Sequence, residues 1–188
     1  MVETIDIPED FFITSDTWFG RNEILKISNR NFKNIQEMNA HLVKMWNKKV
    51  KNTDVVFHLG NFAWDPVTAA GVLEQLNGKI FFILGNSDFA LEEVIETFDN
   101  CMILPVDILD IELESYKYDL VVSHYPLERW NGKAVGTIHA HGHCVYDLKT
   151  NLDIMKRINV CCDFWNYAPI KLSLLKNILE TVKNEKNL

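Results

Sequence analysis

The sequence predicts an α/β protein (α+β in the strict sense) in which two β-sheets pack as a sandwich flanked by helices. Strand-like and helix-like segments alternate in the first half of the chain, whereas the second half is mostly strand-like. Short apolar runs repeatedly end in polar turns, which is where an α/β sheet holds its chemistry. The 188 residues contain no linker, internal repeat or low-complexity stretch, so we expect a single domain spanning residues 1–188.

The first half is expected to contain three strands followed by helices. Residues 11–14, 54–58 and 79–84 are the strand candidates, and the third is apolar enough to be buried on both faces. Asn34 and Glu37 form a capping-box pair at the start of a long helix. Asp65-Pro66 marks the start of another helix, because proline is favoured at the first helical position. Shorter helices are expected over residues 22–28 and 91–98.

The second half is expected to supply the other sheet and a final helix. Four segments have the composition of strands, namely residues 102–111, 118–123, 135–139 and 158–162. Apolar residues recur with helical spacing near the C-terminus, at Leu175, Ile178, Leu179 and Val182. A polar tail follows, which is expected to fray.

Composition limits the classes of partner. The net charge of −7 and the pI of about 5.3 make a broad nucleic-acid-binding surface unlikely, although a local cationic pocket or a bound metal would still hold one phosphate. The apolar runs are too short to cross a membrane, and the N-terminus has no signal-peptide pattern. The four cysteines fit no common zinc motif and are expected to be reduced thiols. We therefore expect a cytoplasmic protein.

Histidines are concentrated near the predicted turns. Histidine is the commonest side-chain metal ligand, so this concentration predicts a metal site. Three of these histidines alternate within the segment 138–145, and two others end strand candidates: His139, His141, His143, His58 and His124. Further polar groups follow the early strands, at Asp16, Asn61 and Asn86.

The polar turns, taken in order, resemble those of the calcineurin-like metallophosphoesterases, in particular the short phosphoesterases of bacteria and phages. The turns are Ser15-Asp16-Thr17-Trp18, Leu59-Gly60-Asn61, Gly85-Asn86-Ser87-Asp88, Ser123-His124-Tyr125 and Gly142-His143. The similarity extends from residue 12 to about residue 174. It implies a β-sandwich with flanking helices, two metal ions at the strand ends, and a location in the cytoplasm of a bacterium or of a phage-infected host cell.

The first metal site implied by this resemblance is damaged. Asp16 matches a ligand, but Trp18 and Val145 stand where the family has histidine ligands. Asn61 stands where a carboxylate should bridge the two metals, and a centre with two dications needs that anionic charge. We therefore expect no dinuclear centre.

No catalytic residue is intact by the same comparison. Ser87 occupies the position of the histidine that protonates the leaving group, and its hydroxyl titrates far too high to act as an acid near neutral pH. Asp88, which would orient that histidine, is present. The resemblance therefore implies an impaired or inactive phosphoesterase.

The second metal site keeps more of its ligands. Asn86, His124 and His143 match, and Asn61 is available as a weak fourth ligand. Such a set would hold one divalent ion, Mn²⁺, Zn²⁺ or Ni²⁺, with modest affinity. The alternative is that these groups hydrogen-bond one another and hold no metal. Both alternatives remain open from the sequence.

Two classes of function follow. The first is a binding protein whose ligand is a protein partner or a phosphorylated or nucleotide molecule. The second is a residual single-metal phosphoesterase that hydrolyses a phosphomonoester or a phosphodiester. A groove for ligand or partner is expected to be bordered by Trp18, His58, Arg129, Trp130 and His141.

Overall fold

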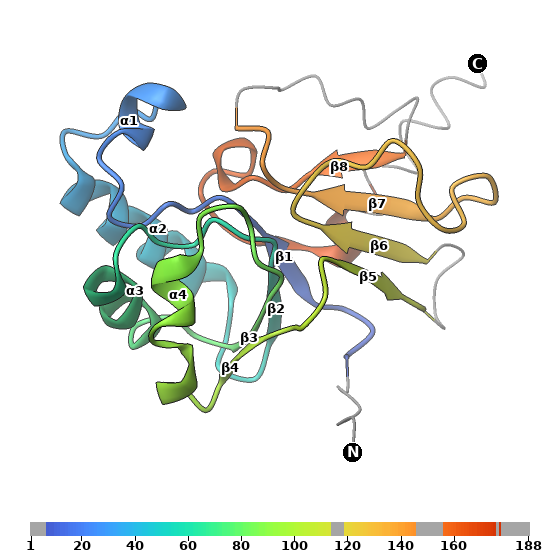
Figure 1. The fold of residues 1–188 in the computed structure, drawn as a ribbon, viewed down its shortest axis with the longest axis horizontal. Coiled ribbons are helices and arrows are strands. Elements are labelled where there is room, and N and C mark those ends of the chain that lie inside the picture. Colours follow the sequence, from blue (N-terminus) through green and yellow to red (C-terminus); the bar gives the residue numbers. More distant parts are fainter. Residues whose placement is uncertain (1–6, 114–118, 146–155, 176, 178–188) are drawn as a thin grey trace.

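Two β-sheets pack against each other, and helices cover the outer face of the larger sheet (Figure 1). The computed structural model describes residues 7–113, 119–145, 156–175 and 177. The five-stranded sheet has the order β4-β3-β2-β1-β9, and the four-stranded sheet has the order β5-β6-β7-β8. This arrangement of two mixed sheets flanked by helices confirms the predicted fold class.

The larger sheet is parallel except at one edge. Its strands are β1 (Phe12–Thr14), β2 (Val55–His58), β3 (Lys79–Phe82), β4 (Cys101–Ile103) and β9 (Ile170–Lys171), and only β9 is antiparallel to its neighbour, β1. Alternate side chains face opposite layers. Phe12, Val56 and Ile80 pack under the helices, whereas Ile13 and Phe57 face the second sheet.

Helices cover the outer face, and α2 and α3 begin where the sequence predicts. The helices are α1 (Ile24–Ile27), α2 (Ile35–Lys49), α3 (Pro66–Leu73) and α4 (Phe89–Glu92), with the 3-10 helices η1 (Ile95–Thr97) and η2 (Cys162–Phe164). The Asn34 side chain accepts the Glu37 N–H at the start of α2, and Asp65 accepts the Thr68 N–H at the start of α3. Among the described helices, none is long and apolar enough to cross a membrane.

The smaller sheet completes the sandwich. Its strands are β5 (Ile108–Ile111), β6 (Leu120–Ser123), β7 (Ile138–His141) and β8 (Arg157–Asn159), and β6, β7 and β8 are parallel. Leu120, Val122, Ile138 and Ala140 face the larger sheet and form the core between the two layers. His139 and His141 alternate with these residues and therefore lie on the other face of β7.

Several predicted boundaries are wrong. The predicted strand 102–111 is two strands in different sheets, because the chain leaves the larger sheet at Leu104 and Pro105 cannot donate to a continuing ladder. The predicted helix 91–98 is broken into α4 and η1, and the predicted strand 135–139 begins at Ile138 and continues to His141. Residues 172–175 are helical as expected, whereas Ile178, Leu179, Val182 and Tyr118 lie outside the described residues.

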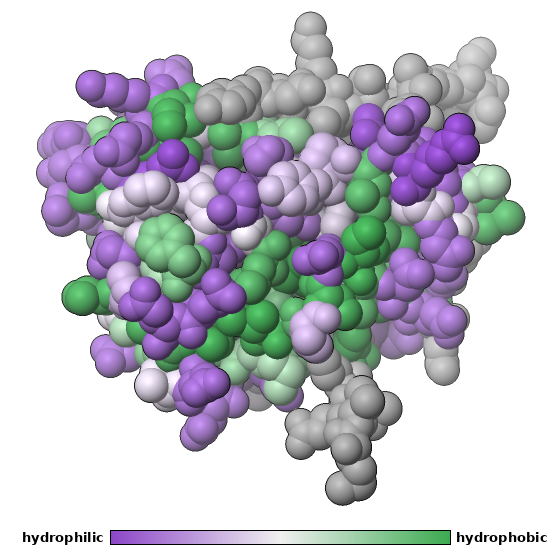
Figure 2. Space-filling view, viewed as in Figure 1, coloured by the Kyte–Doolittle hydropathy of each residue, from purple (hydrophilic) through white to green (hydrophobic). Residues whose placement is uncertain are grey.

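The connection between β4 and β5 leaves apolar side chains exposed. Met102, Val106 and Ile108 are exposed, and Figure 2 shows apolar side chains gathered over the face where these two edge strands run. Polar side chains cover most of the rest of that view. This apolar strip is at the edges of the sheets and is separate from the polar turns described below.

The two sheets meet at their carboxyl ends. The Ser15 N–H donates to Val160 O at 3.1 Å, and the Cys162 N–H donates to Ser15 O at 3.0 Å. This contact joins the turn after β1 to the segment after β8. The turns that follow the parallel strands of both sheets therefore face a common region.

The buried side chain of Arg30 links the two segments of this contact between the sheets. Its guanidinium donates to Thr17 O and Asp16 O at 2.7 Å each, and it forms a forked ion pair with the Asp163 carboxylate at 2.8 and 2.7 Å. The Arg30 side chain is fully buried. One cation thus fixes the turn after β1 to η2, whose Asp163 lies 133 residues after Arg30 in the chain.

Replacing Arg30 is expected to destabilise the protein strongly. Arg30→Met should lower the free energy of unfolding by about 3–5 kcal/mol, because it leaves Asp163 without its partner in a buried setting. Arg30→Lys should recover only part of this loss, since an ammonium cannot reproduce the forked geometry. Urea unfolding at neutral pH measures both effects.

The surface ion pair between Lys171 and Asp10, 3.1 Å apart, provides a matched control. Lys171→Met should cost about 1 kcal/mol or less, because exposed pairs contribute little. Equal losses for Arg30→Met and Lys171→Met would contradict the role assigned to Arg30.

Candidate functional site

Five of the polar residues singled out in the sequence lie together at the carboxyl ends of the strands. The Asn61 amide nitrogen is 3.0 Å from Asp16 Oδ1, 3.3 Å from Asn86 Oδ1 and 3.3 Å from His124 Nε2. The backbone N–H of His143 donates to Asp16 Oδ2 at 2.8 Å. We refer to Asp16, Asn61, Asn86, His124 and His143 as the polar cluster. Their convergence agrees with the expectation from the sequence, whereas their roles are argued below.

The backbone around the polar cluster is strained. Asp16, Trp18, Asn61 and His143 have positive φ angles of 55°, 54°, 60° and 67°. Asp, Asn and His tolerate this region, but a bulky residue such as Trp rarely adopts it. Backbone hydrogen bonds hold the conformation, including Asp16 N–H to Gly60 O at 2.9 Å and Trp18 N–H to Asn61 O at 3.1 Å. Such strain is characteristic of functional sites.

Glycines allow the turns to approach one another closely. Gly60 has a φ of +85°, and a Cβ there would lie 2.4 Å from the Gly85 nitrogen and 2.7 Å from His124 Nδ1. A Cβ at Gly142 would lie 2.7 Å from Asp16 Oδ2. Side chains at these positions would therefore separate the groups of the polar cluster.

The Asp16 carboxyl group is completely buried and is surrounded by hydrogen-bond donors. Besides the Asn61 amide and the His143 N–H, it receives the Cys161 thiol at 3.0 Å. No described lysine or arginine forms an ion pair with this carboxyl group. Among the described residues, the donors to this carboxyl group are therefore neutral, whereas the metal centres that the sequence resembles would place a cation beside it.

His124 and His143 point ring nitrogens at each other. His124 Nδ1 is 2.7 Å from Leu59 O, and because a carbonyl only accepts, this nitrogen carries the proton. His124 Nε2 then faces Asn86 Oδ1 at 3.0 Å and His143 Nδ1 at 3.2 Å. Burial and the neighbouring His124 lower the pKa of His143, and Asp16 opposes this shift.

These three atoms form a nearly equilateral triangle. The third side, from His143 Nδ1 to Asn86 Oδ1, is 3.2 Å. Ligands that surround one small divalent ion at about 2.1 Å are separated by roughly 3 Å, so the triangle has the dimensions of one face of a metal site. The residues of the second implied metal site therefore fit a single ion. Among the described residues, no group of three or more His, Cys, Asp or Glu side chains is arranged to hold a metal.

The residues of the first implied metal site do not fit an ion. Trp18 exposes only 5% of its surface and belongs to the apolar core beneath the helices. The Asn61 amide nitrogen, which cannot coordinate a cation, is directed at Asp16. These two side chains therefore do not offer lone pairs to a second ion in this conformation.

Hydrogen bonds within the polar cluster can supply a donor to three of its acceptors. Two N–H groups of the Asn61 amide and one on His143 Nδ1 supply three donors. The three facing acceptors are Asp16 Oδ1, Asn86 Oδ1 and His124 Nε2. Each of these three acceptors can receive one donor, whereas the buried Asn61 Oδ1 has no hydrogen-bond partner.

The Asp88 carboxylate is bound by backbone N–H groups. Its carboxylate accepts the N–H groups of Asn61, Phe62 and Gly85 at 2.6–2.7 Å. Burial raises the pKa of Asp88, and these three donors oppose the rise. Ser87, next to it, accepts a hydrogen bond from the Asn86 amide at 3.1 Å. Asp88 thus fixes the turns after β2 and β3, and the Ser87 hydroxyl contacts the polar cluster only through Asn86.

The groove expected from the sequence is wrong for three of its five residues. Trp18, His58 and His141 are 5%, 0% and 0% exposed, so they cannot border an open groove. His58 donates from Nε2 to Thr17 Oγ1, whose hydroxyl donates in turn to Phe62 O. His141 Nδ1 donates to Gly142 O. These two buried histidines therefore stabilise the turns through hydrogen bonds to Thr17 and Gly142.

The remaining two groove residues, Arg129 and Trp130, lie in the connection from β6 to β7. Arg129 is exposed. The Trp130 indole donates to Thr137 O at 2.9 Å and stacks near His139, with ring centroids 5.2 Å apart. These contacts are at the start of β7, whereas the polar cluster follows its end.

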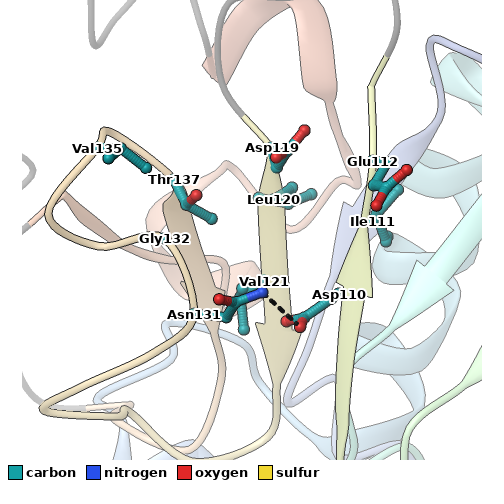
Figure 3. Close-up of a pocket in the computed structure, with 10 residues that line it drawn as sticks. All are labelled: Asp110, Ile111, Glu112, Asp119, Leu120, Val121, Asn131, Gly132, Val135 and Thr137. Carbon is teal, nitrogen blue, oxygen red and sulfur yellow. Dashed lines mark hydrogen bonds between the residues drawn. The ribbon is translucent and has the colours of Figure 1, made fainter.

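A cavity of about 520 Å³ lies beside the same connection (Figure 3). Its lining includes the carboxylates of Asp110, Glu112 and Asp119, and the Asn131 amide donates to Asp110 at 3.2 Å. Three carboxylates repel an anion. This cavity is therefore unsuited to a phosphorylated ligand.

Sequence reasoning missed an arginine held by aromatic rings near the polar cluster. The Arg21 guanidinium carbon is 4.1 Å from the centre of the Trp18 ring and 4.8 Å from that of Trp64. Phe89 packs against Trp64 with ring centroids 6.0 Å apart. The sequence offered one signal, since each of these residues lies close to a polar turn, but it could not predict that they meet.

Comparison with known proteins identifies proteins of similar sequence and fold, but it does not identify an activity. No protein-family model matches the chain. The uncharacterized protein MJ1445 of Methanocaldococcus jannaschii is 33% identical over 178 residues, covering 92% of both chains. The crystal structure of AQ665, a protein of unknown function from Aquifex aeolicus, superposes with a TM-score of 0.70 at 22% identity, over 90% of this chain and 98% of that chain. An archaeal phosphodiesterase, 16% identical, reaches only 0.46 over 81% of this chain and 82% of that chain, which is too low for an inference.

Stability should fall as the solution is acidified, because two histidines are buried. Burial lowers the pKa of His58 to about 3 and that of His139 to about 4. In the unfolded chain these groups take up protons below about pH 6.5, whereas the folded protein resists protonation. Each histidine therefore contributes full stability above that pH and loses about 1.4 kcal/mol per pH unit below it.

Urea unfolding at several pH values between about 6 and 4.5 measures this slope. His58→Phe, placed among Phe62 and Phe82, should make the dependence shallower by about 1.4 kcal/mol per pH unit. Parallel curves for the wild-type protein and the variant would contradict the assignment.

Proposed function

This chain belongs to the same family as the uncharacterized protein of Methanocaldococcus jannaschii. From the geometry of the polar cluster and the resemblance of its turns, we propose that it is a catalytically impaired metallophosphoesterase-like protein that acts by binding. The ligand that its site suits best is a phosphorylated small molecule, with a protein partner as the other option. The net charge of −7 argues against a broad nucleic-acid surface.

The Asn61 amide is the observation that carries the proposal. Its nitrogen lies 3.0–3.3 Å from three acceptors of the polar cluster, where a cation would otherwise draw their lone pairs. A carboxylate at this position would put a second acidic group beside Asp16 and would demand a cation. The neutral amide lowers that demand, and its nitrogen supplies donors to acceptors that would otherwise face a cation.

Two further features support impaired catalysis. Trp18 is packed into the apolar core and offers no lone pair to a metal. Ser87 cannot protonate a leaving group near neutral pH, and the Asp88 carboxylate is held by three backbone N–H groups. A metal ligand, a bridging carboxylate and a general acid are thus replaced together by Trp18, Asn61 and Ser87.

The triangle of His124 Nε2, His143 Nδ1 and Asn86 Oδ1 favours a second candidate function, a single-metal phosphoesterase. The Leu59 carbonyl orients His124 as such carbonyls orient metal-ligating histidines. One divalent transition ion there, Mn²⁺, Zn²⁺ or Ni²⁺, would supply positive charge for a phosphate. His143 would have to hold its proton on Nε2 to bind through Nδ1.

The number of metal ions bound per chain distinguishes a metal-free binding protein from a single-metal phosphoesterase. We expect at most one ion per chain after Mn²⁺ loading and dialysis, because only one set of side chains has ligand geometry. Elemental analysis gives the stoichiometry, with His143→Ala as the control that should remove any bound ion. A value near two would show that other groups replace the missing ligands.

Activity is expected to be absent on generic phosphomonoesters and phosphodiesters with added Mn²⁺. Ser87→His alone should remain inactive, although a general acid is typically worth about 10²–10⁴-fold, because the lost groups act as a unit. Repair at all four positions, Trp18→His, Asn61→Asp, Ser87→His and Val145→His, should raise metal content and give some turnover.

A spectrophotometric assay with nitrophenyl phosphate esters measures both expectations. Robust Mn²⁺-dependent hydrolysis by the unmodified protein, abolished in His143→Ala, would overturn the binding function and establish the single-metal enzyme.

A further inference from the structure

Arg21 is the best-positioned cation near the polar cluster. Its guanidinium lies over the Trp18 ring at 4.1 Å and over the Trp64 ring at 4.8 Å. Aromatic faces attract a guanidinium electrostatically and restrict its motion. Arg21 is therefore held in place by two indoles and not by an acidic side chain.

This arginine has unused hydrogen-bonding capacity. Its Nε is buried and has no hydrogen-bond partner, so the two terminal NH2 groups are the ones that can reach a ligand. Within the described part of the chain, no carboxylate forms an ion pair with this guanidinium. When aromatic rings cover a guanidinium, its N–H groups remain available at the edge of the plane, where they match the oxygens of a phosphate.

The arginine site adjoins the polar cluster. Trp18 N–H donates to Asn61 O at 3.1 Å, and Trp64 N–H donates to Phe19 O at 2.8 Å. The turns after β1 and β2 therefore run side by side from the polar cluster to the two indoles. Phe89 directly follows Asp88, whose carboxylate binds the N–H groups of Asn61 and Phe62.

Two exposed aromatic rings lie in series beside the arginine: Trp64 contacts its guanidinium, and Phe89 contacts Trp64. Trp64 is 40% exposed and Phe89 is 51% exposed, and the two rings meet edge to face with centroids 6.0 Å apart. Exposed aromatic rings of this kind stack on nucleobases, largely without regard to the base. A flat aromatic group and an anion can thus be bound within one small region.

We propose that Arg21, Trp64 and Phe89 form a binding site for a nucleoside monophosphate. The Arg21 guanidinium binds the phosphate, the exposed aromatic rings contact the base, and Trp18 holds Arg21 in position from beneath. This inference rests on the proposed binding function and names its ligand class. The acidic cavity of Figure 3 offers no competing anion site.

Titration with AMP, adenosine and inorganic phosphate in metal-free buffer containing EDTA tests the site. Calorimetry should show AMP binding at least about tenfold more tightly than adenosine, since a hydrogen bond to a charged group is worth about 10–100-fold. Arg21→Gln should abolish that preference and leave the affinity for adenosine unchanged. Phe89→Ala should weaken AMP and adenosine alike, by about 5–100-fold.

Arg129→Gln is the matched control, because it removes an exposed arginine from the connection between β6 and β7. It should leave both affinities unchanged. Arg21→Lys, which keeps the charge but loses the planar fork, should retain part of the preference for AMP. The ratio of AMP to adenosine affinity within one variant is insensitive to a general loss of folded protein.

Three results would overturn the proposal. They are no AMP binding at millimolar concentration, equal affinities for AMP and adenosine in the wild-type protein, and an unchanged affinity ratio in Arg21→Gln. The last result, together with a lowered melting temperature, would show that Arg21 only clamps the two indoles. Hydrolysis of AMP that requires Mn²⁺ and His143 would instead defeat the binding function while leaving Arg21 as the phosphate contact.

Discussion

The buried carboxyl group of Asp16 is the constraint around which the site is built. It has no access to solvent, so protein groups must satisfy both of its oxygens. The donors come from three distant segments, through the Asn61 amide, the His143 N–H and the Cys161 thiol. Arg30 binds the backbone carbonyl of the same residue and anchors it to Asp163. The turns of both sheets are therefore fixed by the need to surround one acidic side chain.

The same constraint explains the strained backbone and the glycines. Donors can reach Asp16 only if the turns approach within hydrogen-bonding distance, and Gly142 leaves no Cβ to prevent this. The positive φ angles at Asp16 and His143 turn the chain toward the cluster immediately after β1 and β7. Strain of this kind costs of order 1–3 kcal/mol per residue and persists only where the surrounding contacts fix the conformation.

Much of this architecture could be predicted from local sequence, and the rest depends on distant contacts. Strand ends and helix caps are local, so the positions of Asp16, Asn61 and Asn86 after β1, β2 and β3 followed from apolar runs and turn residues. The passage of residues 102–111 from one sheet to the other was not predictable from hydrophobicity, since both halves are apolar. The pairing of Arg30 with Asp163 spans 133 residues and leaves no local signal. Burial also reversed the expectation for Trp18, which lies in the core and not in a groove.

Trp18 and Asn61 together change the electrostatics of this strand-end site. In the metal centres that the sequence resembles, cations at the strand ends balance acidic groups and attract phosphate. Here the Asn61 amide satisfies Asp16 without a cation, and the Trp18 ring, at the position of a lost ligand, carries the guanidinium of Arg21 on its face. A guanidinium remains charged at every physiological pH, but it neither activates water nor bridges two oxygens as a metal does. Under the proposed function, this exchange of cation would keep the attraction for phosphate and remove the means of hydrolysing it, which would give a binding protein on this fold.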